Sequence, residues 1–277
     1  MSVTSGGVVE SRYGYIAGGF TRDDEGYSDS TGEVTVDGAG SKWTISSVES
    51  EDGVLYVGKY GSGKLNITNG GVVSCETGYV GYESNSMGKI LVSKGKATVS
   101  GNSATWTNSK SLKVIGTIDI TRGGVVSCGA GAIYNGGQVL IDGYGSKWTN
   151  HDDLYVGKGT LNISNRGLAS AGRLRVYSLV KMSRGGMLAL LGKADNSLTD
   201  FLGLMTGYDK LRCWSDSTAN WDWIWNATKG EDYTLEFTEE GDLAGYTVLT
   251  VGVVPEPSTI GLILTGLVTL MLFRRRR

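Results

Sequence analysis

A block of eight residues recurs along the chain, and this recurrence constrains the fold more than any other feature. Residues 37–44 read Asp-Gly-Ala-Gly-Ser-Lys-Trp-Thr, residues 142–149 read Asp-Gly-Tyr-Gly-Ser-Lys-Trp-Thr, and a degraded copy lies at 100–107. The tryptophans of the two later copies, Trp106 and Trp148, lie 42 residues apart. A unit of this length cannot bury its apolar face alone, so the repeat predicts neighbouring units that stack around one continuous core.

A second block follows the first in each unit. It reads Leu-Tyr-Val-Gly-Lys and then Leu-Asn-Ile-Thr, or a close variant, and its copies lie at 55–74, 112–127 and 154–168. A shortened copy occupies 174–188, and residues 1–9 resemble the end of one more copy. Because the chain opens inside a repeat and without a basic, apolar leader, we expect the natural protein to begin further upstream.

Within the units, apolar residues alternate with polar ones over short segments. Residues 65–67, 118–120 and 161–163 each place one polar residue between two apolar ones, which is typical of a strand with one buried face. Glycine, Asn, Asp or Ser separates the segments and suits tight corners. Proline, which cannot donate to a strand ladder, is absent before Pro255. The sequence therefore predicts an all-β fold of short parallel strands, a β-solenoid with two triangular coils in each 42-residue unit.

The repeat fades after residue 190, and residues 191–252 predict a small β-rich cap. Residues 194–207 are mildly amphipathic and predict a short helix, whereas 233–237 and 246–251 predict two strands. A cap is expected at this point because the uncovered end of a stack of strands leaves backbone groups unpaired and invites aggregation.

Four of the seven tryptophans fall within twelve residues of this cap segment. Trp221, Trp223 and Trp225 alternate with other residues, so on one strand their rings would share a face. Two interpretations remain open. The rings form the hydrophobic core of the cap, since aromatic side chains dominate small cores, or they offer a platform on which sugar rings stack.

The end of the chain joins a rigid motif, an apolar run and a basic cluster. Pro255 and Pro257 are the only prolines and flank Glu256. An uncharged apolar run begins at Thr259 and ends at Phe273, and as a helix it would measure roughly 22 Å against a hydrocarbon core of about 30 Å. The run is followed by four arginines, Arg274, Arg275, Arg276 and Arg277. Because arginines resist translocation, the pattern predicts a C-terminal transmembrane helix with a cytoplasmic basic end and the rest of the chain outside.

This tail resembles the PEP-CTERM sorting signal of Gram-negative bacteria. The resemblance implies that Pro255, Glu256 and Pro257 are recognised by an exosortase, a membrane-embedded protease or transpeptidase that removes the tail during delivery to the surface. The repeats resemble the autotransporter-passenger and PEP-CTERM-associated repeats, which implies a right-handed parallel β-helix over residues 1–190.

The resemblance also implies an order of regions and a route. The expected order is a β-solenoid at 1–190, a β-rich cap at 191–252 and the sorting signal at 253–277. The protein is expected to be exported, to pass through the inner membrane as a precursor, and to end at the cell surface or in the extracellular matrix.

Charge and cysteine content exclude several classes of function. The net charge is −2 with no basic stripe, which argues against a nucleic-acid partner. The three cysteines are an odd number and imply no disulfide framework. Cys75 and Cys128 occupy equivalent places in two repeats and are either small residues stacked in a ladder or a disulfide or metal pair, whereas Cys213 stands alone.

No pattern in the sequence predicts catalysis, a metal or a cofactor. His151, the only histidine, is expected in a loop before a strand, and Asp37 and Asp142 precede glycines at turns, where hydrogen bonds to their own backbone explain them. Asp119 and Arg122 come nearest to the acidic and basic residues of a polysaccharide-cleaving β-helix, but they are local neighbours on a turn. Zinc spacing, a nucleophile elbow and a phosphate loop are all missing from the sequence.

The sequence thus favours one function and leaves an alternative. The favoured function is an exported, non-catalytic structural spacer of the cell surface or extracellular matrix, with exosortase as its processing partner. The alternative is a glycan-binding, adhesin-like surface module that contacts exopolysaccharide or other surface glycans through its outward faces or the tryptophan segment. An enzyme acting on acidic polysaccharide is a third possibility that fold analogy alone does not support.

Overall fold

The computed structural model describes residues 1–18, 30–47, 51–86, 89–194, 197–216 and 218–252. No helix within these ranges is long and apolar enough to cross a membrane. The sorting motif at Pro255, Glu256 and Pro257, the apolar run from Thr259 to Phe273 and the terminal arginines lie outside the described residues. The transmembrane segment and the recognition motif therefore stay predictions.

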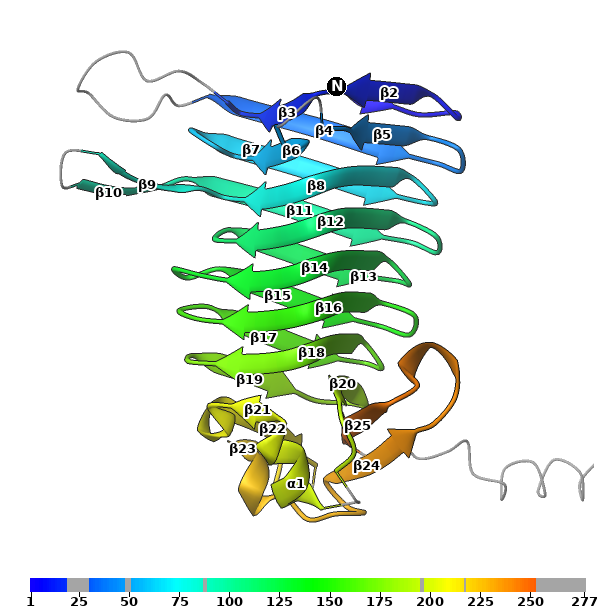
Figure 1. Cartoon of the computed structure of the whole chain (residues 1–277), viewed down its shortest axis with the longest axis vertical. Helices are drawn as coiled ribbons and strands as arrows, with labels where there is room; N and C mark the ends of the chain where they lie inside the picture. Colours follow the sequence, from blue (N-terminus) through cyan, green and yellow to red (C-terminus); the bar gives the residue numbers. More distant parts are fainter. Residues whose placement is uncertain (19–29, 48–50, 87–88, 195–196, 217, 253–277) are drawn as a thin grey trace, which may run out of the picture.

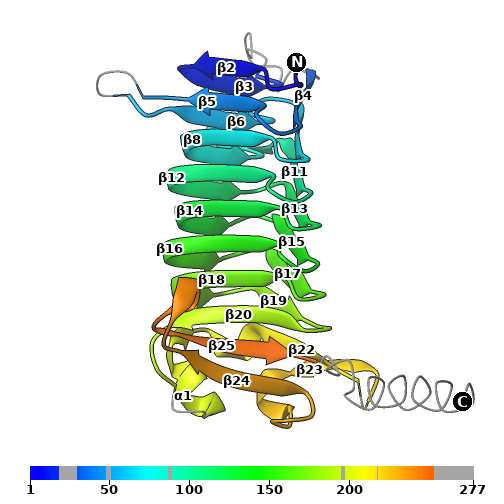
Figure 2. The same cartoon turned by 90° about the vertical axis from the view of Figure 1, so that its right-hand side faces the viewer.

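Two long sheets of stacked strands make up most of the described chain (Figures 1 and 2). The first sheet contains, in spatial order, the ten described strands β1 (Ser2–Val3), β4 (Thr31–Asp37), β7 (Ser62–Thr68), β11 (Lys94–Ser100), β13 (Thr117–Thr121), β15 (Gln138–Asp142), β17 (Thr160–Ser164), β19 (Leu179–Met182), β22 (Leu211–Ser215) and β23 (Asn220–Trp223).

The second sheet lies beside the first. Its main path runs through the described strands β2 (Val8–Ser11), β5 (Lys42–Ile45), β8 (Val72–Val80), β12 (Thr105–Val114), β14 (Val125–Ile133), β16 (Lys147–Val156), β18 (Leu168–Val176), β20 (Gly186–Leu191), β25 (Tyr246–Val251) and β24 (Tyr233–Thr238). Shorter strands pair beside this path, namely β3 (Tyr13–Ile16), β6 (Val54–Val57) and β21 (Met205–Thr206).

The chain alternates between the two sheets, and we call one pass through both sheets a rung. Strands β13 and β14 form one rung and β15 and β16 the next, and equivalent strands of successive rungs pair in parallel. Ile118 pairs with Val139, and Val139 pairs with Leu161, so the apolar positions are stacked in register. The predicted all-β character with parallel sheets is confirmed.

Each 42-residue unit of the sequence fills two rungs. Trp106 on β12 pairs with Val126 on β14, and Val126 pairs with Trp148 on β16. The register of the second sheet shifts midway, between Asn108 and Ser111 on β12, so each rung carries three strand segments. An unforeseen antiparallel hairpin, β9 (Glu83–Ser86) with β10 (Lys89–Val92), lies between β8 and β11 along the chain and projects from the side of the stack (Figure 1).

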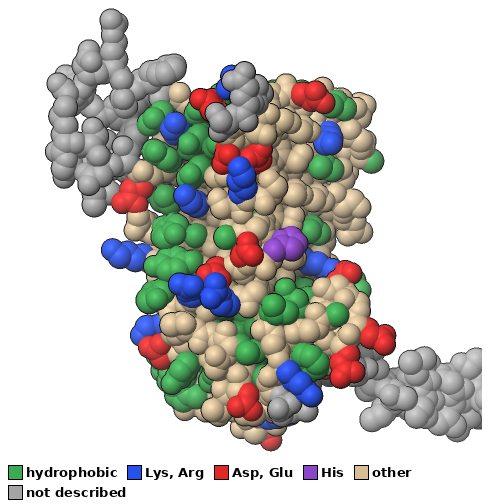
Figure 3. Space-filling view, in the orientation of Figure 1, with side chains coloured by type: hydrophobic (Ala, Val, Ile, Leu, Met, Phe, Trp, Pro, Cys, Tyr) green, Lys and Arg blue, Asp and Glu red, His purple; other side chains and the backbone are tan. Residues whose placement is uncertain are grey.

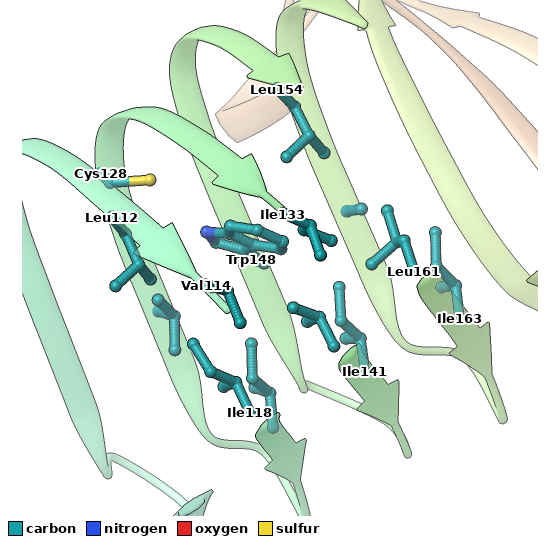
Figure 4. Close-up of a cluster of buried hydrophobic side chains, with 14 of the residues drawn as sticks. Leu112, Val114, Ile118, Cys128, Ile133, Ile141, Trp148, Leu154, Leu161 and Ile163 are labelled. Atoms are coloured by element: carbon teal, nitrogen blue, oxygen red, sulfur yellow. The ribbon is translucent and has the colours of Figure 1, made fainter. Parts of the chain in front are cut away.

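Alternation sends every second side chain into a continuous core between the sheets. The apolar residues of the three predicted triplets are all buried: Leu65, Ile67, Ile118, Ile120, Leu161 and Ile163. The polar residues between them, such as Asn66 and Asn162, lie half-buried on the outer face. Figure 4 shows side chains from both sheets filling the space around Trp148, which is 1% exposed. The predicted inward and outward faces are confirmed.

Each buried indole of the repeats packs over a glycine of the preceding rung. A Cβ added at Gly131 would lie 2.7 Å from Cζ2 of Trp148, and one added at Gly78 would lie 3.0 Å from Cζ2 of Trp106. A larger residue at either glycine would displace the ring. This is the physical reason why rungs with a tryptophan alternate with rungs that have a glycine opposite it.

A ladder of buried polar side chains follows the register shift of the second sheet. Cys75, Asn108, Cys128 and Asn150 occupy successive rungs. Sγ of Cys75 donates to Oδ1 of Asn108 at 3.1 Å, and Sγ of Cys128 donates to Oδ1 of Asn150 at the same distance. Burial raises the pKa of both thiols to about 12. Both cysteines are free, so the prediction of stacked small residues is confirmed and the disulfide alternative is wrong.

Turn aspartates connect neighbouring rungs. Oδ1 of Asp37 accepts a hydrogen bond from Oγ1 of Thr68 at 2.5 Å and another from Nδ2 of Asn69 at 2.8 Å. Asp142 makes the same two contacts with a serine and an asparagine of the following rung. The prediction that these carboxylates bond to their own backbone is wrong, because the in-register threonine or serine lies directly beside them.

Antiparallel strands close the C-terminal end of both sheets. Strand β25 pairs antiparallel with β20 and with β24, and β23 pairs antiparallel with β22. Helix α1 (Leu198–Gly203) lies where a short helix is predicted, and Oγ of Ser197 accepts from the backbone N–H of Asp200 at its start. Short 3₁₀ turns complete the region, namely η1 (Tyr208–Lys210), η2 (Ile224–Asn226) and η3 (Gly241–Leu243). The predicted cap helix and cap strands are confirmed.

Candidate binding surface at the tryptophan cluster

Strands β22 and β23 hold the tryptophans of the cap on the outer face of the first sheet. The buried side of β22 consists of Leu211, Cys213 and Ser215. Arg212 and Trp214, which alternate with them, therefore face outward. In the antiparallel pair, Arg212 lies opposite Trp223 and Trp214 lies opposite Trp221. Because opposed residues project to the same side of a sheet, two strands bring three indoles and one guanidinium together.

Trp225, the third of the alternating tryptophans, lies beyond the end of strand β23. Strand β23 ends at Trp223, and the chain continues through η2, where Ile224 is fully buried and Trp225 is 44% exposed. The apolar Ile224 takes a core position, and the backbone turns to place it there. The prediction that Trp221, Trp223 and Trp225 share the face of one strand is therefore wrong for Trp225.

Trp223 forms a stack with an aromatic and a cationic neighbour. Its ring and that of Trp225 are nearly parallel, with centroids 5.2 Å apart and an interplanar angle of 8°. The guanidinium carbon of Arg212 lies 4.0 Å from the centroid of Trp223, which is a close cation–π contact. Nε of Arg212 is buried and has no hydrogen-bond partner within the described part of the chain.

Trp221 belongs to a second group beside this stack. It meets Trp214 edge to face, with centroids 5.7 Å apart and an interplanar angle of 75°. Nζ of Lys181, on the adjacent strand β19, lies 5.3 Å from the centroid of Trp221. We use the name tryptophan cluster for Trp214, Trp221, Trp223 and Trp225 together with Lys181 and Arg212.

The carboxylates near the cluster accept hydrogen bonds from neutral groups. Asp222 accepts from Nδ2 of Asn226 at 2.9 Å and from the backbone N–H of Trp223 at 2.7 Å, and these bonds hold the pKa of the Asp222 carboxyl below its usual value. Asp216 accepts from Nε1 of Trp214 at 2.9 Å. The hydrogen bonds of these acids orient the loop and an indole, and the nearby charge of Arg212 also lowers the pKa of Asp222.

The exposure of the cluster separates the two interpretations of these tryptophans. Trp106 and Trp148 of the repeats are 0% and 1% exposed, whereas Trp225 is 44% exposed and the other three cap indoles are partly exposed. The core of the cap is built mainly from aliphatic residues with Phe201 and Tyr233, and it includes Leu211, Ile224, Leu235 and Leu249. The interpretation of the cap tryptophans as a hydrophobic core is therefore wrong.

A second aromatic surface, which the sequence analysis missed, lies over the strand ends of the second sheet. In Figure 3, hydrophobic side chains gather along the left edge of the molecule. The ring of Tyr56 stacks on Tyr15 at 5.3 Å and on Tyr79 at 4.7 Å, and Nζ of Lys59 lies 4.3 Å from its centroid. The signal is the tyrosine of the Tyr-Val-Gly motif, which falls at one ladder position. Tyr56 is covered on both faces by its neighbours, whereas Tyr15 lies at one end of the stack and is 50% exposed.

The loop between β24 and β25 walls a groove of about 750 Å³ against the outer face of β16 and β18. Its polar side chains include Lys147, Thr149, His151, Ser170, Glu240 and Asp242. His151, the single purple side chain in Figure 3, lies within strand β16, so its predicted place in a loop before the strand is wrong. Its Nδ1 lies 3.0 Å from the carbonyl oxygen of Cys128, and this contact orients the ring.

Asp119 and Arg122, the residues that come nearest to the acidic and basic pair of a polysaccharide-cleaving β-helix, lie in different structural contexts. Asp119 forms an ion pair with Lys96 of the neighbouring rung at 2.9 Å. Arg122 occupies a turn with a φ of 54°. In the ranges that the structure describes, no group of three or more His, Cys, Asp or Glu side chains is arranged to hold a metal ion.

Comparisons of this chain with protein-family models, with curated proteins and with solved structures find no match. The assignment of the tryptophan cluster as a candidate binding site therefore depends on the chemistry of its own residues.

Proposed function

We propose that this chain is an exported structural repeat protein of a Gram-negative cell surface or extracellular matrix, without catalytic activity of its own. The observation that carries the proposal is the tail, in which Pro255, Glu256 and Pro257 precede an apolar run and four arginines. The body to which this tail is attached supports the same function, because stacked rungs give length to a protein without a separate core for each unit.

The body in this proposal is a right-handed parallel β-helix, a β-solenoid. Its support is the alternation of successive strands between the two sheets and the parallel pairing of equivalent strands over many rungs. The resemblance of the repeats to those of autotransporter passengers points the same way. A long, narrow fold of this kind suits a spacer that holds one end of the protein at a distance from the cell.

Delivery in this proposal depends on exosortase and on a transient stay in the inner membrane. The run from Thr259 to Phe273 spans the membrane of the precursor, and the arginines from Arg274 to Arg277 hold its end in the cytoplasm. Cleavage near the Pro-Glu-Pro motif then releases the body to the surface.

The test is the fate of a Pro257→Ala precursor. We expect the variant to remain uncleaved in the inner membrane, as shown by cell fractionation and by the mass of the chain. Val253→Ala, which lies outside the motif, is the matched control and should be processed normally. An unchanged surface yield of Pro257→Ala would refute the sorting assignment.

Glycan binding through the tryptophan cluster is a second candidate function. It is favoured by the solvent contact of the cap indoles, which contrasts with the buried indoles of the repeats. Binding sites commonly combine aromatic surfaces with a few fixed polar groups. Loss of binding to bacterial exopolysaccharide on Trp221→Ala, with an unchanged β-rich circular dichroism spectrum, would support this function. Retained binding would contradict its assignment to the cluster.

A further inference from the structure

The tryptophan cluster contains two cations that make no ion pair with a carboxylate in the described part of the chain. Lys181 on β19 and Arg212 on β22 are register partners and therefore neighbours on the outer face. Asp216 and Asp222, the acids within the tryptophan segment, accept hydrogen bonds from neutral side chains, and Arg212 acts on Asp222 only as a nearby charge that helps to lower its pKa. Both cations contact indole rings, and Nε of Arg212 is buried without a hydrogen-bond partner. The surface therefore offers positive charge directly beside aromatic rings.

Trp225 supplies the exposed ring of the cluster. It stacks on Trp223 at 5.2 Å and retains 44% exposure, so much of its surface is available to a ligand. The faces of a pyranose ring carry C–H groups, which pack well on a flat aromatic surface. Among the stacked tyrosines, Tyr56 is covered on both faces, whereas Tyr15 at the end of that stack is 50% exposed.

A neutral amide lies next to the cations on the outer face. Asn162 on β17 is the register partner of Lys181 and is half-buried. Its side chain can both donate and accept hydrogen bonds, which matches the hydroxyl groups of a sugar. Across four adjacent strands, Asn162, Lys181, Arg212 and Trp223 thus form one row of outward side chains.

We infer that the tryptophan cluster binds an acidic polysaccharide. A uronic acid ring packs on Trp225, carboxylates of neighbouring residues of the same polysaccharide lie toward Arg212 and Lys181, and hydroxyl groups reach Asn162. The planar guanidinium of arginine suits a carboxylate, and a neutral glycan would leave both cations unused. This inference rests on the proposed glycan binding and adds the chemical class of the ligand.

The experiment compares two oligosaccharides of equal length on the full chain in detergent, by isothermal titration calorimetry. Alginate hexamers are the acidic probe and cellohexaose is the neutral probe. We expect the wild type to bind alginate and not cellohexaose, and Trp225→Ala to weaken alginate binding by about tenfold or more. Lys181→Gln and Arg212→Gln should each weaken it by about three- to tenfold, and the difference from wild type should shrink at high salt.

Two exposed side chains outside the cluster provide matched controls. Tyr144→Ala removes a ring that is 81% exposed on the turn after β15, and Lys158→Gln removes an exposed positive charge. Both variants should bind alginate like the wild type. Circular dichroism verifies the fold of each variant, and Lys181→Gln tests the charge requirement if Arg212→Gln does not fold.

Each alternative result has a distinct meaning. Equal binding of alginate and cellohexaose would overturn the acidic class and leave glycan binding standing. Binding of neither probe would overturn both the ligand class and the glycan function of the cluster. Alginate binding that survives Trp225→Ala, or that is lost equally in Tyr144→Ala, would overturn the placement of the site.

Discussion

Buried amides hold neighbouring rungs together at the register shift of the second sheet. Oδ1 of Asn150 accepts from Sγ of Cys128 on the rung before, and its Nδ2 donates to the carbonyl oxygen of Ser170 on the rung after, at 3.1 Å. Asn108 has the same arrangement in the preceding repeat. A buried polar group is costly unless it is paired, so an amide at this position disfavours any slip of one rung against the next.

Replacement of Asn150 by alanine should destabilise the fold by about 1–3 kcal/mol, because a buried carbonyl loses its donor and a buried thiol loses its acceptor. Urea unfolding followed by circular dichroism measures this difference. Asn102→Ala, on an exposed turn, is the control and should lie within about 0.5 kcal/mol of the wild type. Equal stability of the two variants would contradict a structural role for the buried amide of Asn150.

Gly131 should tolerate no side chain, although its backbone conformation is ordinary. An added Cβ would lie 2.1 Å from Oδ1 of Asn150 and 2.7 Å from Cζ2 of Trp148, both of them buried. We expect Gly131→Ala to cost about 1–3 kcal/mol of unfolding free energy through overpacking. Gly203→Ala, which meets nothing within 4 Å, is the matched control. A Gly131→Ala protein as stable as the control would show that the indole can shift at little cost.

At the scale of the element, the repeat strands could be predicted because the alternation that builds them is local. In residues 65–67 and their equivalents, the alternation of apolar and polar residues directly predicts which side chains face inward and which face outward. The strands 233–237 and 246–251 were predictable for the same reason. Local alternation failed at Trp225, since the pattern continues there while the burial of Ile224 decides the path of the backbone.

Features that depend on pairing between rungs could not be read from the sequence alone. Asp37 has its partners Thr68 and Asn69 more than thirty residues away, and only the register of β4 with β7 brings them together. The stack of Tyr15, Tyr56 and Tyr79 and the proximity of Lys181 to Arg212 likewise depend on the pairing of strands from neighbouring rungs. The tryptophans of the candidate site could be found from their clustering, whereas their cationic neighbours required the sheet order.

The contact between β4 and β7 should make the N-terminal rungs sensitive to acid. Hydrogen bonds from Lys64 and from Thr68 hold the pKa of the Glu33 and Asp37 carboxyls, respectively, below their usual values. A carboxyl whose pKa is lower in the folded state stabilises the protein above its unfolded pKa, and this contribution is lost as the pH falls. The thermal unfolding midpoint should therefore decrease from about pH 5 toward pH 3.

Asp37→Asn tests the contribution of one of these carboxyls. The amide retains an acceptor oxygen for Thr68 and does not titrate, so the variant should lose less of its melting temperature on acidification than the wild type does. Differential scanning calorimetry across this pH range supplies the comparison. Identical pH dependence of the two proteins would assign the acid sensitivity to other groups.

At the scale of the whole molecule, the stack grows along one axis and ends in a cap of a different kind. Figure 2 shows the rungs layered one upon another above the C-terminal region. There β23 and β24, which run antiparallel to their neighbours, form the outermost strand of each sheet. Open strand edges promote association between chains, and strands of reversed direction break the parallel repeat at this end.

Layering along one axis predicts a solution shape that differs from that of a compact domain. A compact domain of the length of residues 1–252 would have a radius of gyration of about 18 Å. Because each rung adds length and hardly any width, small-angle X-ray scattering from a chain that ends at Gly252 should give a larger value and a distance distribution with a long tail. The circular dichroism spectrum of the same sample should be dominated by β structure. A radius near that of the compact domain would contradict a rod made of stacked rungs, and with it the proposed role as a spacer.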